Sequence, residues 1–298
     1  MSEVLADFSA ALAAAVETAG KSVVRVEGRR RLPATGIVWS ADGLIVTAHH
    51  VVEEDENIGI GLPDGRTATA RLVGRDPSTD LALLRAEASG LAAASWAGVE
   101  TLKVGHVVLS LGRPGHTVMA TFGIVSALGA SWRTPAGGQV DRYLQTDAVM
   151  YPGFSGGPLV STAGQIVGLN TSALLRGISL AIPTGTVRGV AEILLAHGRV
   201  RRGYFGVTAQ VARLPGSIAQ QLTQETGLLL SSVEAGSPAE RGNLFMGDLI
   251  VAVAGEAVGD LDDLLAVLGS DRVGTAVPVR FVRGGQLQET SVTVGEQP

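Results

Sequence analysis

The amino-acid sequence predicts a mainly β protein with two domains, in which antiparallel sheets closed into barrels or sandwiches precede a small α+β domain. Between residues 22 and 183, short apolar runs such as SVVRVEG, GLIVTAHHVV and QIVGLNTS follow one another at strand-and-turn spacing. Forty glycines supply the turns that such sheets need. After the basic linker 199–202, strands alternate with short helical segments. We therefore place the two domains at 1–202 and 203–298.

Composition limits the classes of function. With 46% hydrophobic and 17% charged residues over 298 positions, the chain has ample material for packed cores and is not of the disordered class. The net charge of −5 includes no basic block, so we expect no nucleic-acid partner, because phosphate binding needs clustered Lys and Arg. The absence of cysteine excludes disulfides and thiolate metal sites, and no other ligand cluster predicts a metal or an organic cofactor.

The N-terminal segment MSEVLADFSAALAAAVETAG predicts an amphipathic helix rather than a signal peptide. Glu3 and Asp7 stand where a signal peptide would be basic. Apolar residues recur at helical spacing at Leu5, Phe8, Leu12 and Val16. We expect this helix to pack on the body or on a neighbouring subunit. We also expect no membrane span and a cytoplasmic location, with the cell envelope or secretion as the alternative if the sequence has been trimmed.

The stretch YPGFSGGPLV at 151–160 lies in an uncharged run long enough to suggest a membrane span. Residues that break helices recur within it, at Pro152, Gly153, Gly156, Gly157 and Pro158. We therefore predict a loop between two strands. A glycine-flanked serine such as Ser155 is more often a simple tight turn than a nucleophile. Small neighbours, however, also allow backbone N–H groups to converge on one point and stabilise an oxyanion.

A nucleophilic serine needs a base and a carboxylate that orients this base. His49 and His50 end the strongly apolar run IVTA, where a strand would reach the rim of a barrel. Asp80 directly precedes the apolar run LALLRA. Taken alone, Asp80 is better explained as a cap or turn residue. Together with Ser155, these residues could form a Ser-His-Asp triad.

Several long motifs together resemble the HtrA/Deg family of serine proteases. ADGLIVTAHHVV, GRDPSTDLALLR, GIVSALG and QTDAVMYPGFSGGPLVSTAGQIVGLNT occur in the order His, Asp, Ser, and RGYFGV, GSPAERGNL and GDLIVAVAGEAV resemble the PDZ domain that follows in that family. The resemblance covers nearly the whole chain after residue 20. It implies a chymotrypsin-like double β-barrel protease domain followed by one PDZ domain.

The resemblance also implies roles for individual residues. Ser155 is the nucleophile, and His50 is the general base, because it directly precedes the Val-Val pair of the motif. His49 is then a bystander. Asp80, rather than Asp76 in the same turn, is the orienting carboxylate.

The oxyanion hole implied by the resemblance consists of the backbone N–H groups of Gly153 and Ser155. Phe154, between them, departs from the family, which usually has Asn at this position. A bulky ring here would reshape the site entrance or hold the loop at rest. We nevertheless expect an apolar primary specificity pocket of modest size.

In the second domain, the segment GYFGV has the form of a carboxylate-binding loop. The N–H groups of Phe205, Gly206 and Val207 would converge on the C-terminal carboxylate of an extended peptide with an apolar end. The strand VTAQV would pair with this peptide, and the helix in DLDDLLAVLGS would form the other wall of the groove. The alternative is that this segment merely packs against the linker 199–202.

Three classes of function remain: an active endopeptidase regulated by its PDZ domain, a chaperone or holdase with an inactive protease fold, and a PDZ scaffold that binds peptides. The intact set of His50, Asp80 and Ser155 favours the endopeptidase. The resemblance further implies unfolded or misfolded proteins as substrates and cleavage after small aliphatic residues. It also implies a homotrimer, built through the protease domain and its N-terminal segment.

Overall fold

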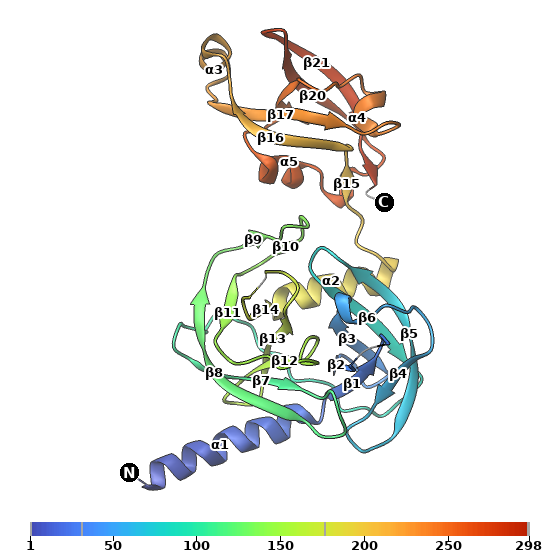
Figure 1. Cartoon of the computed structure of the whole chain (residues 1–298), viewed down its shortest axis with the longest axis vertical. Helices are drawn as coiled ribbons and strands as arrows, with labels where there is room; N and C mark the ends of the chain where they lie inside the picture. Colours follow the sequence, from blue (N-terminus) through green and yellow to red (C-terminus); the bar gives the residue numbers. More distant parts are fainter. Residues whose placement is uncertain (1, 31, 176, 297–298) are drawn as a thin grey trace. The chain divides into compact units, whose positions relative to one another are not determined.

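A computed structural model describes residues 2–30, 32–175 and 177–296 of the chain (Figure 1). The chain divides into two compact units, Met1–Val200 and Arg201–Pro298.

The first unit begins with a closed barrel of six antiparallel strands in the order β1-β2-β3-β6-β5-β4. Its strands are β1 (Val23–Glu27), β2 (Ala34–Val38), β3 (Leu44–Ala48), β4 (Ile58–Gly61), β5 (Thr67–Asp76) and β6 (Leu81–Ala86). All five residues of β2 and of β3 are buried, so these strands lie inside the unit. Short apolar runs of the sequence correspond to these strands.

A second closed barrel follows, in the order β11-β14-β13-β12-β7-β8. Its strands are β7 (Val107–Gly112), β8 (Met119–Leu128), β11 (Leu144–Thr146), β12 (Pro158–Ser161), β13 (Ile166–Thr171) and β14 (Leu180–Pro183). A short ribbon of β9 (Trp132–Arg133) and β10 (Gln139–Val140), which the sequence did not predict, lies outside this barrel. The two barrels confirm the predicted double-barrel fold and decide against sandwiches.

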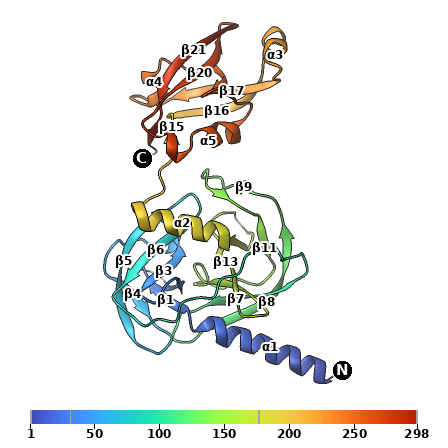
Figure 2. The same ribbon diagram turned by 180° about the vertical axis from the view of Figure 1, so that it is seen from behind.

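Two helices accompany the barrels. In α1 (Ser2–Gly20), Ala15 and Ala19 are buried, whereas Val4 and Leu5 are 71% and 68% exposed. Both ribbon views show the N-terminal half of α1 extending away from the barrels (Figures 1 and 2). In α2 (Thr184–His197), the buried residues Val187, Val190 and Leu194 face the barrel core, and Gly198 ends the helix in a left-handed conformation (φ +74°).

The second unit is a small α+β fold around a main sheet with the order β16-β17-β18-β20-β21, in which β19 pairs with β18, and β15 and β22 form a separate two-stranded sheet. Its strands are β15 (Gly203–Tyr204), β16 (Val207–Arg213), β17 (Thr226–Val233), β18 (Leu249–Val253), β19 (Glu256–Ala257), β20 (Ala276–Arg283), β21 (Gln286–Thr293) and β22 (Gly295–Glu296). Its helices are α3 (Gly216–Leu222), α4 (Pro238–Arg241), α5 (Leu261–Val267) and the 3-10 turn η2 (Ser270–Arg272). Strand β16 forms one edge of the sheet, and this arrangement agrees with the predicted α+β class.

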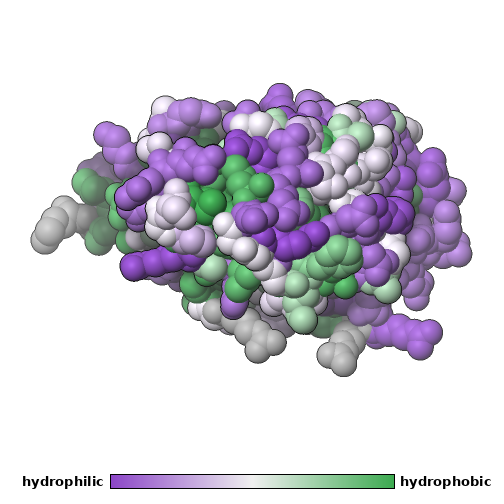
Figure 3. Space-filling view, turned by 90° about the horizontal axis from the view of Figure 1, so that it is seen from above, coloured by the Kyte–Doolittle hydropathy of each residue, from purple (hydrophilic) through white to green (hydrophobic). Residues whose placement is uncertain are grey.

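No helix in the described parts of the chain is long and apolar enough to cross a membrane. The face shown in Figure 3 is mostly hydrophilic, with smaller hydrophobic patches between the polar residues.

Candidate active site

Strand pairing brings the predicted base and its carboxylate together. Strand β3 runs antiparallel to β6, with Ala48 opposite Leu81. The residues that follow β3 therefore lie beside those that precede β6. The strand ends at Ala48, and the 3-10 turn η1 (His49–Val51) carries both histidines, so they lie just past the strand rather than within it.

His50 and Asp80 form a closely bonded pair. The Nδ1 atom of His50 lies 2.8 Å and 3.0 Å from the two carboxylate oxygens of Asp80, and the backbone N–H of His50 donates to the same carboxylate at 2.9 Å. The Asp80 side chain is 3% exposed and that of His50 is 27% exposed. Because a carboxylate accepts hydrogen bonds, the proton of the neutral imidazole lies on Nδ1. The Nε2 atom is then free to accept a proton.

Thr171, at the end of β13, is a third partner of this pair. Its hydroxyl donates to Asp80 Oδ2 at 2.5 Å and its side chain is fully buried. Asp80 itself has a left-handed backbone (φ +58°), which Asp tolerates better than most residues. Sequence reasoning missed Thr171, since its one signal is a polar residue at the end of an apolar strand.

His49 contacts the same aspartate only through the backbone. Its N–H donates to the Asp80 carbonyl oxygen at 3.0 Å. Its Nδ1 atom is buried and has no hydrogen-bond partner among the described residues. Burial is the main cause that lowers the pKa of this imidazole below its usual value. The His49 ring is therefore neutral at pH 7 and makes no hydrogen bond to the Asp80 carboxylate among the described residues.

Ser155 lies in the loop 151–157 that precedes β12. Its hydroxyl pairs with the hydroxyl of Ser172 at 3.3 Å, and within the described chain it makes no hydrogen bond to His50. This distance is long for a bond between two hydroxyls, which usually measures about 2.7–2.8 Å. The structure thus brings Asp80 and His50 together but leaves the Ser155 hydroxyl on Ser172. Catalytic hydrogen bonds often tighten only when substrate binds.

The backbone around Ser155 leaves two N–H groups without acceptors. Phe154 N–H donates to the Tyr151 carbonyl at 3.0 Å and Gly156 N–H donates to the Asn170 carbonyl at 2.9 Å. The N–H groups of Gly153 and Ser155 have no acceptor within the described ranges. Gly153 has φ +91°, and a Cβ there would lie 2.6 Å from Pro114 Cβ, so only glycine fits. These two N–H groups are the ones predicted to bind an oxyanion.

The ring of Phe154 points into the protein. It is fully buried, makes an edge-on contact with Tyr151 at 5.8 Å between ring centroids, and lies so close to Gly112 that a Cβ there would collide with it. The ring therefore does not occupy the entrance of the site. It anchors the loop 151–157 from below.

In the second unit, the segment 203–207 forms a fixed turn before the edge strand β16. The carbonyl of Phe205 accepts from Ala239 N–H and that of Gly206 from Glu234 N–H, both at 2.9 Å. Gly206 has φ +75°, and the Phe205 side chain is 2% exposed. Gly203 and Tyr204 pair with β22.

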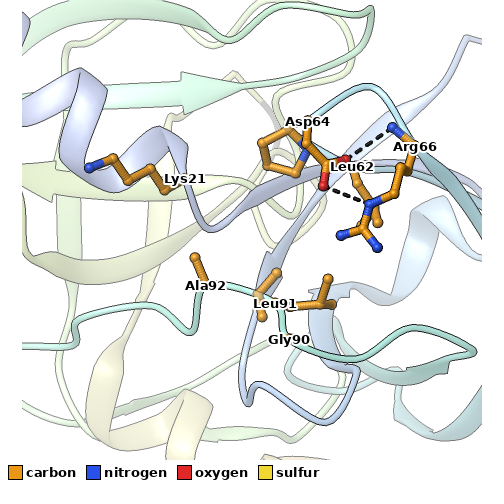
Figure 4. A pocket seen from close by; sticks show the side chains of 9 residues that line it. Lys21, Leu62, Asp64, Arg66, Gly90, Leu91 and Ala92 are labelled. Atoms are coloured by element: carbon orange, nitrogen blue, oxygen red, sulfur yellow. Dashed lines mark hydrogen bonds and ion pairs between the residues drawn. The ribbon is translucent and has the colours of Figure 1, made fainter.

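One cavity, of about 350 Å³, lies on the first barrel (Figure 4), and none of the candidate site residues lines it. Lys21, Leu62, Asp64, Arg66 and Leu91 are among the residues that line it. Arg66 donates to the neighbouring Asp64, so these two charges largely satisfy each other. No group of three or more His, Cys, Asp or Glu residues that could hold a metal occurs in the described chain.

Comparison with known proteins identifies the family of both domains. Residues 34–169 match the trypsin-like peptidase domain and residues 203–294 match the PDZ domain. The crystal structure of the serine endoprotease from Yersinia pestis is 32% identical, with a TM-score of 0.78, and the match covers 95% of this chain and 97% of that one. The HtrA-type protease AlgW with tripeptide is also similar, at 31% identity, a TM-score of 0.75, and coverage of 96% and 97% of the two chains. The chain belongs to the HtrA family of serine proteases.

A curated HtrA relative corrects the expected location. The probable periplasmic serine endoprotease DegP-like of Chlamydia trachomatis is 36% identical over 280 residues, which make up 92% of this chain and 56% of that protein. This chain thus spans little more than half the length of that relative. Similar proteins from Marinomonas and Ectopseudomonas are also named periplasmic. The predicted cytoplasmic location is therefore wrong, because it depended on the N-terminal residues alone, and the relatives point to the cell envelope.

Proposed function

We propose that this chain is an active serine endopeptidase that degrades unfolded or misfolded proteins. In this proposal Ser155 is the nucleophile, His50 the general base and Asp80 the orienting carboxylate. The observation that carries it is the His50–Asp80 pair, in which His50 Nδ1 lies 2.8 Å from a carboxylate oxygen of Asp80. The serine loop beside this pair has two N–H groups without an acceptor among the described residues. Membership of the HtrA family supports the same chemistry.

The proposed reaction is acyl transfer in two stages. The Ser155 hydroxyl turns from Ser172 to His50 Nε2 and attacks the substrate carbonyl while His50 takes its proton. Asp80 stabilises the imidazolium that forms, and Thr171 keeps the carboxylate in place. The N–H groups of Gly153 and Ser155 bind the oxyanion. His50 then protonates the leaving amine, and water releases the acyl group by the reverse steps.

The functional domains that we propose are a protease domain at 1–202 and a PDZ domain at 203–298. In the PDZ domain, the N–H groups of Phe205, Gly206 and Val207 bind the C-terminal carboxylate of a peptide, which adds a strand to the edge of β16. The fixed turn at Gly206 and the edge position of β16 support this assignment. Peptide binding there would regulate the protease.

We further propose a homotrimer built through α1 and the second barrel. The N-terminal half of α1 exposes Val4 and Leu5, and Phe8 is 41% exposed. Phe8 makes an edge-on contact with Phe122 of β8, which is itself 56% exposed. A second subunit would cover these apolar side chains.

The substitution Ser155→Ala tests the proposed activity. Cleavage of denatured casein should fall by about 10⁴-fold or more, because the acyl-enzyme cannot form. The fold should persist, as circular dichroism and thermal unfolding would report. Wild-type protein should also react with a serine-directed phosphonate, and Ser155→Ala should not. A wild-type chain that neither cleaves casein nor reacts would favour the chaperone or scaffold alternatives.

A further inference from the structure

Arg113 is a buried cation held without a carboxylate. It follows β7, is 6% exposed, and forms no ion pair in the described part of the chain. Its guanidinium instead donates to three backbone carbonyls: Nε to Val23 at 2.7 Å, one terminal nitrogen to His116 at 2.7 Å, and the other to Gly20 at 3.1 Å. The three carbonyls belong to the start of β1, to the loop after Arg113, and to the end of α1. Arg113 therefore ties three segments together.

The backbone of Arg113 continues this connection toward the serine loop. Its N–H donates to the hydroxyl of Thr35 at 2.8 Å, and that hydroxyl donates to the carbonyl of Gly153 at 2.7 Å. The N–H of Thr35 also donates to the carbonyl of Ser155 at 3.2 Å. Thr35 is fully buried in β2. One threonine thus holds the carbonyls on both sides of Phe154.

Steric contact reinforces the same connection. Pro114, directly after Arg113, lies so close to Gly153 that no Cβ could be placed there, and Gly112, directly before Arg113, adjoins the ring of Phe154. The segment 112–114 therefore contacts the loop 151–157 through two neighbouring residues as well as through Thr35.

We propose that Arg113 is a positioning residue for the oxyanion loop. It anchors the segment 112–114 to the end of α1 and to β1, and through Thr35 it fixes the 153–154 and 155–156 peptide groups. These two adjoin the peptide groups that present the N–H groups of Gly153 and Ser155. Burying a guanidinium without a carboxylate costs free energy of folding, and the hydrogen bonds to three backbone carbonyls offset that cost only if the carbonyls are held in place. Burial lowers its pKa, but an arginine stays protonated at neutral pH. The catalytic part of this inference rests on the proposed protease function.

The test compares Arg113→Met with Arg113→Lys and Arg142→Met in the full chain. Arg142 also donates to one backbone carbonyl, that of Val99 at 3.1 Å, but has no connection to the oxyanion loop, so it is the matched control. In Arg113→Met, kcat for a peptide substrate should fall by about tenfold or more while KM changes little, because a displaced oxyanion donor weakens only transition-state binding. Arg113→Lys should recover part of the loss, and Arg142→Met should leave kcat unchanged.

A second measurement does not depend on activity. Hydrogen exchange followed by mass spectrometry should show faster exchange over 151–157 in Arg113→Met but not in Arg142→Met. Thr35→Val, which removes the hydroxyl and preserves the shape of the side chain, should give the same two changes and replaces Arg113→Met if that variant does not fold. Unchanged exchange over 151–157 in a folded Arg113→Met or Thr35→Val variant would overturn the proposal. An inactive wild type with altered exchange in the variants would overturn the protease function but leave the anchoring role standing.

Discussion

At the scale of single residues, two adjacent histidines contact the same aspartate in different ways. The imidazole of His50 bonds to the Asp80 carboxylate, whereas His49 reaches Asp80 only through its backbone N–H. We expect His50→Ala to lower kcat/KM by about 10⁴-fold, like the serine variant, because no base remains to accept the serine proton. His49→Ala should keep at least about a fifth of the wild-type value, since it removes no group from the proton transfer. Steady-state kinetics on a peptide substrate measure both.

The ranking of these two variants is the decisive comparison. The backbone N–H of residue 49 survives in His49→Ala, so this variant is the natural control for a general disturbance of η1. If His49→Ala were inactive and His50→Ala active, the assignment of the base would be off by one residue.

At the scale of elements, the edge of β16 and the turn before it form the candidate peptide site. We expect the full chain to bind a peptide with a free apolar C-terminus at least about tenfold more tightly than the same peptide with an amidated C-terminus, because amidation removes the charge that the N–H groups bind. Isothermal titration calorimetry gives both dissociation constants. Equal constants would rule out carboxylate binding, whether or not the peptide itself binds.

Helix α5 would form the other wall of the peptide-binding groove, and the leucines in this helix and at its C-terminal end differ in exposure. Leu264 and Leu268 are buried in the core of the second unit, whereas Leu261 is 49% exposed and Leu265 is half-buried. These four leucines recur at helical spacing and form one stripe, but only part of that stripe is exposed to a ligand. The periodicity predicted the helix correctly and did not distinguish core from groove.

At the scale of the whole molecule, the exposed apolar part of α1 predicts assembly. We expect Leu5→Asp combined with Phe8→Asp to convert a trimer into a monomer, because burying two carboxylates in an apolar contact is unfavourable. Size-exclusion chromatography with light scattering would measure the mass. Glu17→Lys, on an exposed position of the same helix, is the control and should remain trimeric. A wild-type chain that is monomeric would refute this assembly.

Much of the architecture followed from local patterns. Short apolar runs separated by turn residues predicted most strands of both barrels and the principal strands of the PDZ domain, because strand formation depends on neighbouring residues. The small elements β9, β10, α3 and β15 carry few residues and weak patterns, and none of them was predicted. The triad residues could be proposed because each of them lies in a short sequence motif. The cellular location could not be predicted from such a motif, and the cytoplasmic location inferred from the N-terminal residues was wrong.

By itself, the sequence determined the order of the domains and the mainly β class of the first one, and its resemblance to a known family implied the double barrel and the candidate triad. Only the tertiary structure decided which partners hold that triad. Thr171 bonds to Asp80 across 91 positions of the chain, Arg113 to Gly20 across 93, and Thr35 to Gly153 across 118. Each contact exists because the two barrels close and bring distant strand ends together. A single polar residue in an apolar run does not indicate which distant group it will contact, so the sequence alone could not predict these partners.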